Sequence, residues 1–155
     1  MPKTARDIMS TTVIVVRPEQ TLAEAARLML EHRISTLPVV SPEGELVGII
    51  THSDFQVRGR LLPFSQREVP EVLHHLTSWQ EMEESYREAM ARRVREVMSH
   101  PVHTVAPDTP VAEVAALMLR HNIKRVPVVE GGRIVGLISR HDFLKLMLEA
   151  ADPQE

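Results

Sequence analysis

The sequence contains no cysteine, which excludes disulfide bonds, thiolate metal sites and cysteine nucleophiles. Long apolar runs are also missing. Leu46–Ile50 is typical, whereas a helix that crosses a bilayer needs about 20 apolar residues, so we expect no membrane partner. Residues 1–10 have no apolar core of the kind that a signal peptide needs. Together these absences predict a cytoplasmic protein.

The chain also lacks a strong charge of either sign and the common catalytic motifs. Its 155 residues carry a formal net charge of −3, so no broad basic field attracts nucleic acid, and we expect no nucleic-acid partner. There is no phosphate-binding glycine loop and no G-x-S-x-G sequence, and the eight histidines do not have the spacing of a metal site. We therefore expect neither an enzyme nor a bound metal or other cofactor.

An internal repeat is the main feature that the chain does contain. A shift of 89 residues aligns 8–40 with 97–129 and gives 16 identities in 33 pairs. After a one-residue deletion the shift becomes 88, which aligns Gly48 with Gly136. Each repeat has about 55 residues, a size at which a single core is only marginally stable. We therefore expect two similar units that bury their apolar faces against each other.

The segment between the repeats has no copy. Apolar residues recur at spacings of three and four from Trp79 to Val97, which predicts one long amphipathic helix over residues 78–97. The simplest role for this helix is to pack onto the rest of the module, and the alternative is a contact with a second copy or another protein. The predicted domains are a first unit over 1–56, an inserted helical segment over 57–93 and a second unit over 94–155.

Both repeats predict the same order of elements. In the first, the β-branched residues 13–16 predict a strand, and the capping-box pair Thr21 and Glu24 begins a helix. In the second, Thr109 is the expected cap, with Pro110 at the first helical position. A hairpin and a second helix follow in each repeat, so the order is β-α-β-β-α. The predicted hairpin strands are 37–40, 46–50, 126–129 and 134–138.

These motifs resemble the CBS domain family, named after cystathionine β-synthase. The matching pieces are IMSTTVIVVRPEQTLAEAARLMLEHRISTLPVV with GIITHSD, and VMSHPVHTVAPDTPVAEVAALMLRHNIKRVPVV with GLISRHD. The resemblance implies an α+β fold in which two β-α-β-β-α CBS units pack sheet to sheet with pseudo-two-fold symmetry, with a helical insertion between them. It also implies that an adenosine-containing ligand binds in clefts between the units, and that the chain forms a homodimer.

The candidate ligand residues include a hydroxyl residue and an aspartate three positions later in each repeat, namely Thr51 with Asp54 and Ser139 with Asp142. In one interpretation each pair is a capping box at the start of a helix. In the other, the helix N-terminus attracts an anion and the carboxylate accepts both hydroxyl groups of a ribose. The resemblance favours ribose binding by the aspartate and places the hydroxyl residue near the base or phosphate. The two roles are compatible.

Lys124 and Arg125 stand where the first repeat has Ser35 and Thr36. They are either solvated charges at a strand edge or, as the resemblance implies, phosphate ligands, with Arg140 adding to them. The difference between the repeats predicts unequal pockets. The pocket with Lys124 and Arg125 should favour phosphorylated ligands, and the other should bind a less anionic ligand, bind weakly or stay empty.

Four apolar residues are candidates for the walls that hold the base, although core packing is their ordinary role. These residues are Val13, Leu37, Val102 and Val126.

Two functions fit the sequence. The first is a non-catalytic regulatory module that binds AMP, ADP, ATP or S-adenosylmethionine and passes the signal to an unidentified effector protein. The second is a structural or interaction protein that dimerises through its CBS units and retains only vestigial ligand clefts. Stabilisation by adenosine compounds distinguishes the two, because a ligand that binds only the folded state raises its stability.

Overall fold

The computed structural model describes residues 2–57, 60–61 and 79–152, which fall into two compact units. We call residues 14–43, 47–57, 60–61 and 79–102 the N-unit, and residues 2–13, 44–46 and 103–152 the C-unit. The described elements, in chain order, are α1 Ala5–Ile8, α2 Leu22–His32, β1 Thr36–Val40, β2 Leu46–Thr51, the 3-10 helix η1 His52–Asp54, β3 Gln56–Val57, β4 Arg60–Leu61, α4 Trp79–Met90, α5 Val94–Val97, α6 Val111–His121, β5 Arg125–Glu130, β6 Arg133–Ser139 and α7 Arg140–Ala151.

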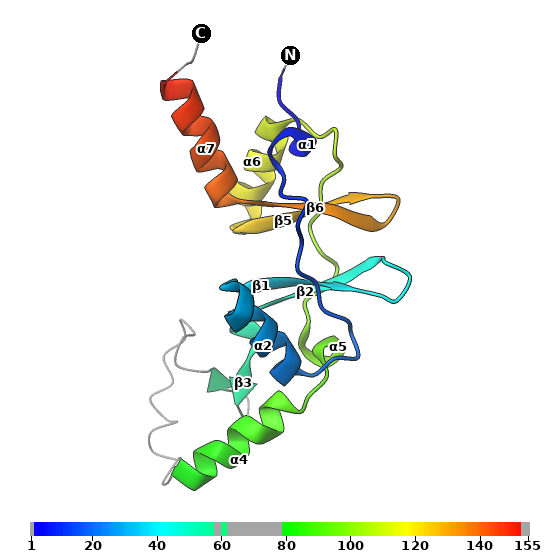
Figure 1. Cartoon of the computed structure of the whole chain (residues 1–155), viewed down its shortest axis with the longest axis vertical. Coiled ribbons are helices and arrows are strands. Elements are labelled where there is room, and N and C mark those ends of the chain that lie inside the picture. Colours follow the sequence, from blue (N-terminus) through cyan, green and yellow to red (C-terminus); the bar gives the residue numbers. More distant parts are fainter. Residues whose placement is uncertain (1, 58–59, 62–78, 153–155) are drawn as a thin grey trace. The chain divides into compact units, whose positions relative to one another are not determined.

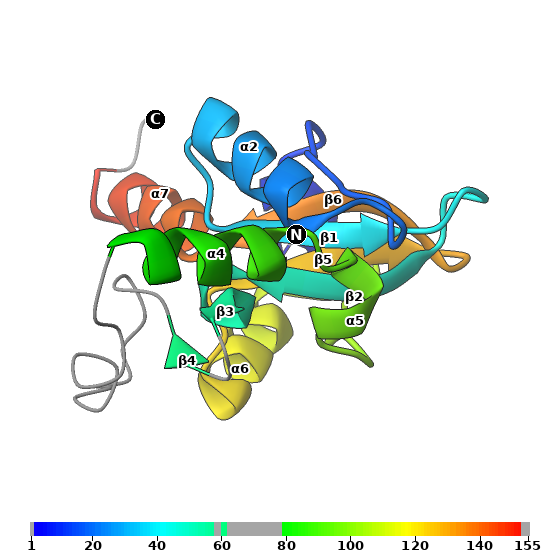
Figure 2. The ribbon, with the colours of Figure 1, turned by 90° about the horizontal axis from the view of Figure 1, so that it is seen from below.

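The N-unit is organised around the two-stranded sheet of β1 and β2. Helices α2, α4 and α5 lie on the same side of this sheet in Figure 1, and Figure 2 shows them spread across it. All five residues of β1 are buried, which explains why residues 37–40 of this strand are a continuous apolar run without alternation. The core of the N-unit forms where the helices meet the sheet, and it includes Leu22, Met29, Leu37, Ile50 and Val94.

The C-unit repeats this plan with the antiparallel strands β5 and β6, whose register shifts between Val128 and Val129. Helices α1, α6 and α7 lie on one side of the hairpin (Figure 1). Val114 from α6, Val126 from β5 and Ile138 from β6 are fully buried in its core. Both repeats therefore fold by burying one face of a hairpin beneath helices.

The segment that begins each repeat pairs with the hairpin of the other repeat. In the C-unit, Ser10 and Leu137 exchange two backbone hydrogen bonds of 2.9 Å. In the N-unit, the repeat-related residues Ser99 and Ile49 do the same at 2.9 and 3.0 Å. Helix α1 consequently belongs to the C-unit and α5 to the N-unit. The compact units thus exchange their N-terminal segments relative to the sequence repeats.

The structure confirms the helix that follows the first capping box. The Glu24 N–H donates to Thr21 Oγ1 at 3.2 Å, and the Thr21 N–H donates to Glu24 Oε2 at 3.3 Å. Helix α2 ends at His32, where Arg33 adopts the left-handed conformation. The predicted hairpins are also present, within one or two residues at each end.

The strand predicted at residues 13–16 is wrong, because only Val16 pairs, as a parallel bridge to Val39. The Val16 N–H donates to the carbonyl of Pro38 at 3.0 Å, and the Val16 carbonyl accepts from the Val40 N–H at 2.9 Å. Val105 makes the equivalent bridge to Val128 in the second repeat. The β-branched run therefore contributes one bridge to the sheet and no regular strand.

The cap predicted at Thr109 is also wrong, since Pro110 is the N-cap of α6. The Thr109 hydroxyl instead accepts a hydrogen bond of 3.0 Å from the Ala106 N–H. Thr109 therefore closes the turn that precedes α6.

The single long helix predicted over residues 78–97 is two helices, α4 and α5. The N–H groups of Val94 and Arg95 donate to the carbonyls of Gln20 and Pro18, at 2.8 and 3.0 Å. These tertiary bonds replace the bonds that a continuous helix would make. Ala89 is buried in the core of the N-unit, and Tyr86 and Met90 pack against it, which confirms the packing interpretation of this segment.

None of the helices in the described parts of the chain combines the length and apolarity that a membrane crossing requires.

Candidate functional site

The carboxylate of Asp142 lies at the start of α7, directly after β6. Its Oδ2 accepts the backbone N–H of Ser139 at 2.8 Å and the Ser139 hydroxyl at 3.3 Å. Both bonds fall on one oxygen, and the described residues give no partner to Oδ1. Asp142 thus caps the helix and still presents an acceptor, which is the arrangement that combines the two predicted roles.

Asp54 occupies the related position in the N-unit, at the end of η1. Its Oδ2 accepts the Thr51 N–H at 2.8 Å and the Thr51 hydroxyl at 3.4 Å, and that hydroxyl also contacts Ser53 Oγ at 2.8 Å. Burial raises the pKa of Asp54, and the hydrogen bond from the Thr51 backbone opposes this effect only in part. The two carboxylates therefore share one geometry in different surroundings.

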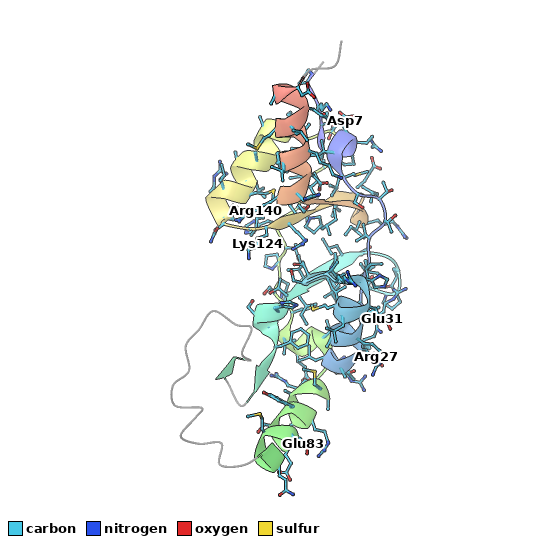
Figure 3. The ribbon with its side chains drawn as sticks, turned by 60° about the vertical axis from the view of Figure 1, so that its left-hand side comes forward. Asp7, Arg27, Glu31, Glu83, Lys124 and Arg140 are labelled. Atoms are coloured by element: carbon cyan, nitrogen blue, oxygen red, sulfur yellow. The ribbon has the colours of Figure 1, made fainter. Side chains whose placement is uncertain are left out.

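Three cationic residues lie beside Asp142 in the C-unit. The register pairs Arg125 with Ser139, and the Arg140 N–H donates to the Lys124 carbonyl at 3.2 Å. Lys124 and Arg140 are exposed, and Figure 3 shows them close together at the end of the hairpin. The hairpin and the start of α7 thus bring Lys124, Arg125, Ser139, Arg140 and Asp142 to one place.

Two segments of the chain, residues 5–56 and 94–149, match the family model of the CBS domain. The chain belongs to the CBS domain family. The predicted recognition is confirmed, and the described α+β units agree with a tandem CBS fold.

One curated relative and two solved structures illustrate what this chain is similar to over most of its length. The uncharacterised protein MJ1426 of Methanocaldococcus jannaschii is 30% identical, and the match covers 92% of this chain and 90% of that protein. The crystal structure of the CBS domain of a CBS-domain-containing membrane protein from Sphaerobacter thermophilus has a TM-score of 0.74 and 42% identity, and covers 94% of this chain and 88% of that one. The CBS domain pair of protein MJ0100, in complex with 5-methylthioadenosine and S-adenosyl-L-methionine, has a TM-score of 0.69 and 27% identity, with coverages of 97% and 99%.

The two CBS repeats are not equivalent at their candidate sites. Where the second repeat has Lys124 and Arg125, the first has Ser35 and Thr36, and Thr36 is buried. Where the second repeat has Arg140, the first has His52. The fixed positive charges are thus concentrated at the C-unit site.

The four candidate wall residues fall in different places. Leu37 and Val126 are fully buried in the cores of the N-unit and the C-unit, so packing is their role in this structure. Val13 and Val102 are half-buried and lie at the points where the chain passes from one unit to the other. The proposal that these side chains hold a base stays a prediction.

The sequence interpretation overlooked Asn122, which contacts Arg140 at the C-unit site. The side-chain oxygen of Asn122 accepts a hydrogen bond of 3.4 Å from Arg140 Nη2, and Asn122 itself adopts the left-handed conformation after α6. The ring of His103 stacks on that of His121 with their centroids 3.9 Å apart. An asparagine directly after a helix is a known signal for a left-handed cap, so the position of Asn122 was predictable, although its contact with Arg140 was not.

Proposed function

We propose that this CBS-domain chain is a non-catalytic regulatory module that binds an adenosine-containing ligand in a cleft between its two CBS units. The observation that carries the proposal is the cluster at the end of the β5–β6 hairpin, where Asp142 and three cationic residues lie together. The MJ0100 complex supports the ligand class, since that similar protein holds two adenosine compounds.

Each group in the cluster has a distinct chemical task in this proposal. Asp142 accepts hydrogen bonds from the ribose hydroxyls, since an ionised carboxylate is a strong acceptor with two oxygens. Arg125 and Arg140 bind phosphate through paired N–H groups, and Lys124 acts as a compact point charge. Asn122 is a positioning residue that holds the Arg140 side chain through the 3.4 Å contact.

The N-unit site is expected to prefer a less anionic ligand. Thr51 and Asp54 provide the same hydroxyl–carboxylate geometry, but Ser35 and Thr36 bring no charge for a phosphate. A nucleoside or a nucleoside thioether suits such a site better than a nucleotide does. The proposal therefore assigns unequal ligand preferences to the two repeats.

Regulation follows if the ligand binds one arrangement of the two units more tightly than another. The ligand can shift the populations of the two arrangements only as far as the difference between its affinities for them allows. We further propose that the chain acts as a homodimer in the cytoplasm, where nucleotides are available, and that the shift is read by a separate effector protein.

The experiment is calorimetric titration of the full chain, cleared of co-purified small molecules, with AMP, ADP, ATP, S-adenosylmethionine and 5-methylthioadenosine. We expect at least one of these compounds to bind, and AMP to bind more tightly than adenosine, which is titrated separately as the reference without a phosphate. Thermal unfolding gives a second readout, because ligand at 100 times its dissociation constant adds about 2.7 kcal/mol to the free energy of unfolding. No heat and no thermal shift with any of the five compounds would contradict the proposal.

The alternative is a structural or interaction protein with vestigial clefts. One observation favours it: the second helix of the first repeat is reduced to the three-residue η1. The absence of any ligand response, combined with a stable homodimer, would support this alternative.

A further inference from the structure

The residue that follows helix α2 has a backbone conformation that its side chain disfavours. Arg33 has φ 53° and ψ 47°, in the left-handed region. In the described parts of the chain, Asn122 after α6 is the other non-glycine residue with a positive φ. Asparagine tolerates this region because its short polar side chain bonds locally, whereas the long side chain of arginine does not relieve the crowding. An unfavourable backbone at one residue is a reason to look for a function there.

Arg33 and Asn122 are repeat-equivalent, and the backbone is nearly the same around both. A shift of 89 residues aligns the two positions. Asn122 has φ 51° and ψ 48°. In each repeat the N–H of the isoleucine that follows the cap donates to the carbonyl of a methionine five residues earlier, at 3.0 Å. The two helix caps therefore differ in their side chains and hardly in their backbones.

The C-unit shows which position the side chain of the cap residue meets. Asn122 Oδ1 accepts a hydrogen bond of 3.4 Å from Nη2 of Arg140, the first residue of α7. His52 is the repeat-equivalent of Arg140, and it is the first residue of η1. Because the two caps share one backbone conformation, the side chain of Arg33 can reach the part of the N-unit site where His52 lies.

The two repeats thus carry their arginine at opposite ends of the same contact. The second repeat has asparagine at the cap and Arg140 at the start of the next helix, whereas the first repeat has Arg33 at the cap and His52 at that start. Arg33 is exposed, and none of the described side chains forms an ion pair or hydrogen bond with its guanidinium. The N-unit site therefore has within reach one fixed positive charge, which Ser35 and Thr36 do not supply.

We propose that Arg33 determines the specificity of the N-unit site by binding the carboxylate of an adenosine compound that carries an amino-acid group. A guanidinium holds a carboxylate through two parallel N–H bonds and balances its single charge. A phosphate chain carries more negative charge and is better matched by the three cationic residues of the C-unit site. The ligand is thus an adenosyl amino acid, with its ribose at Asp54 and its carboxylate at Arg33. This inference rests on the proposed function and names the group that the N-unit site selects.

The experiment compares S-adenosylhomocysteine with 5-methylthioadenosine, two adenosyl thioethers of which only the first has an amino-acid group. Calorimetric titration of the full natural chain should show tighter binding of S-adenosylhomocysteine. In Arg33→Asn the affinity for this compound should fall about 10-fold, because a hydrogen-bonded charge is lost, while the affinity for 5-methylthioadenosine should not change. Equal binding of the two compounds by the natural chain, or an equal loss of both in Arg33→Asn, would overturn the inference.

The melting temperature of Arg33→Asn distinguishes ligand recognition from a structural role. Asparagine occupies the equivalent cap in the second repeat and suits the left-handed conformation, so the variant should melt at the temperature of the natural chain or higher. A clear fall in melting temperature would show that Arg33 serves the fold and would contradict the inference.

Arg27→Gln is the matched control for the loss of one surface charge, because Arg27 is exposed on the same helix (Figure 3). This variant should keep both affinities. If it weakens S-adenosylhomocysteine binding as much as Arg33→Asn does, the effect is general electrostatics and the specific role of Arg33 is refuted.

Substitution of the two aspartates assigns the site. Asp54→Asn should weaken both thioethers alike, since it removes the acceptor for the ribose that they share, whereas Asp142→Asn should keep the preference for S-adenosylhomocysteine. The reverse result would exclude Arg33 and the N-unit site as the source of the preference.

The same titrations separate this inference from the proposed function. If the natural chain binds none of the adenosine compounds, the proposed function and the inference both fail. If it binds them but Arg33→Asn leaves the preference for S-adenosylhomocysteine unchanged, the inference alone fails.

Discussion

Met98 packs so closely against Gly48 that a methyl group on this glycine would lie 2.9 Å from Met98 Cγ. Met9 packs against Gly136 in the same way, and there the added methyl would lie 2.7 Å from Met9 Cγ. In each pair the methionine comes from the segment that begins one repeat and the glycine from the hairpin of the other. The identities between Met9 and Met98, and between Gly48 and Gly136, thus have one structural cause.

The first prediction concerns these glycines. Gly48→Ala should lower the free energy of unfolding by about 1–3 kcal/mol, the usual cost of an extra methyl group in a packed interior. The backbone of Gly48 is not left-handed, so the cost should come from the contact with Met98 and not from strain. Urea unfolding of the variant measures the change.

A double-mutant cycle provides the control for this prediction. In a Met98→Ala background the added methyl group enters space that the methionine has left, so Gly48→Ala should cost less there, or even stabilise the protein. An equal cost in both backgrounds would show that the close packing against Met98 is not the reason for the glycine.

The sequence predicted the elements whose signals are local. Residues close together in sequence specify the capping box of Thr21 and Glu24 and the short apolar strands. Helix α2 and the hairpins therefore formed where expected. The prediction of one long helix was wrong because the N–H groups of Val94 and Arg95 donate to carbonyls more than 70 residues away in sequence. These carbonyls belong to Gln20 and Pro18. The exchange of N-terminal segments between the repeats could not be predicted for the same reason, because it depends on tertiary pairing such as that of Ser10 with Leu137.

For the candidate site, too, the sequence predicted the local pattern but not the tertiary contacts. The hydroxyl–carboxylate pairs are three residues apart, so a sequence pattern is enough to find them. The contact between Asn122 and Arg140 joins two elements through a tertiary arrangement, and no spacing rule reveals it. Leu37 and Val126 were indistinguishable from ligand walls because core and pocket positions use the same apolar residue types.

The second prediction separates helix capping from ribose binding at Asp142. Asp142→Asn keeps an oxygen that can accept the Ser139 N–H, so the melting temperature should change little. The affinity for AMP should fall about 10-fold or more, because hydrogen bonds to a charged group contribute about 1.5–3 kcal/mol. Calorimetric titration and thermal unfolding of the same sample give both values.

Asp7→Asn is a matched control, because Asp7 accepts the Thr4 N–H at 2.8 Å in the same type of capping box. Asp7 lies on α1, away from the residues of the candidate site, so its substitution should leave AMP binding unchanged. A fall in AMP affinity of equal size in both variants would refute a specific role for Asp142.

The third prediction assigns phosphate recognition to the cationic cluster. Lys124→Ala should weaken AMP binding about 10-fold while leaving 5-methylthioadenosine, which has no phosphate, nearly unaffected. Arg133→Ala removes the same charge from the turn end of the β5–β6 hairpin and is the control for a general electrostatic effect. If the two variants weaken AMP binding alike, Lys124 does not contact the phosphate.

The last prediction concerns the pH dependence of stability at Asp54. Burial raises its pKa above the ordinary value of about 4, despite the hydrogen bond from the Thr51 backbone. Between that ordinary value and the raised folded pKa, the folded state binds more protons than the unfolded state does. The contribution of Asp54 to the free energy of unfolding is therefore fully present below this range and is lost as the pH rises through the folded pKa.

Comparison of the natural chain with Asp54→Asn from pH 3.5 to 7, by urea unfolding, tests the sign. The advantage of the natural chain over the variant should shrink as the pH rises, because the amide side chain of the variant has no proton to lose. Asp7 gives the opposite control, since the hydrogen bond from the Thr4 backbone lowers its pKa, and the advantage over Asp7→Asn should grow with pH. If both differences grow with pH, the hydrogen bond from Thr51 outweighs the burial of Asp54, and its pKa lies below the ordinary value.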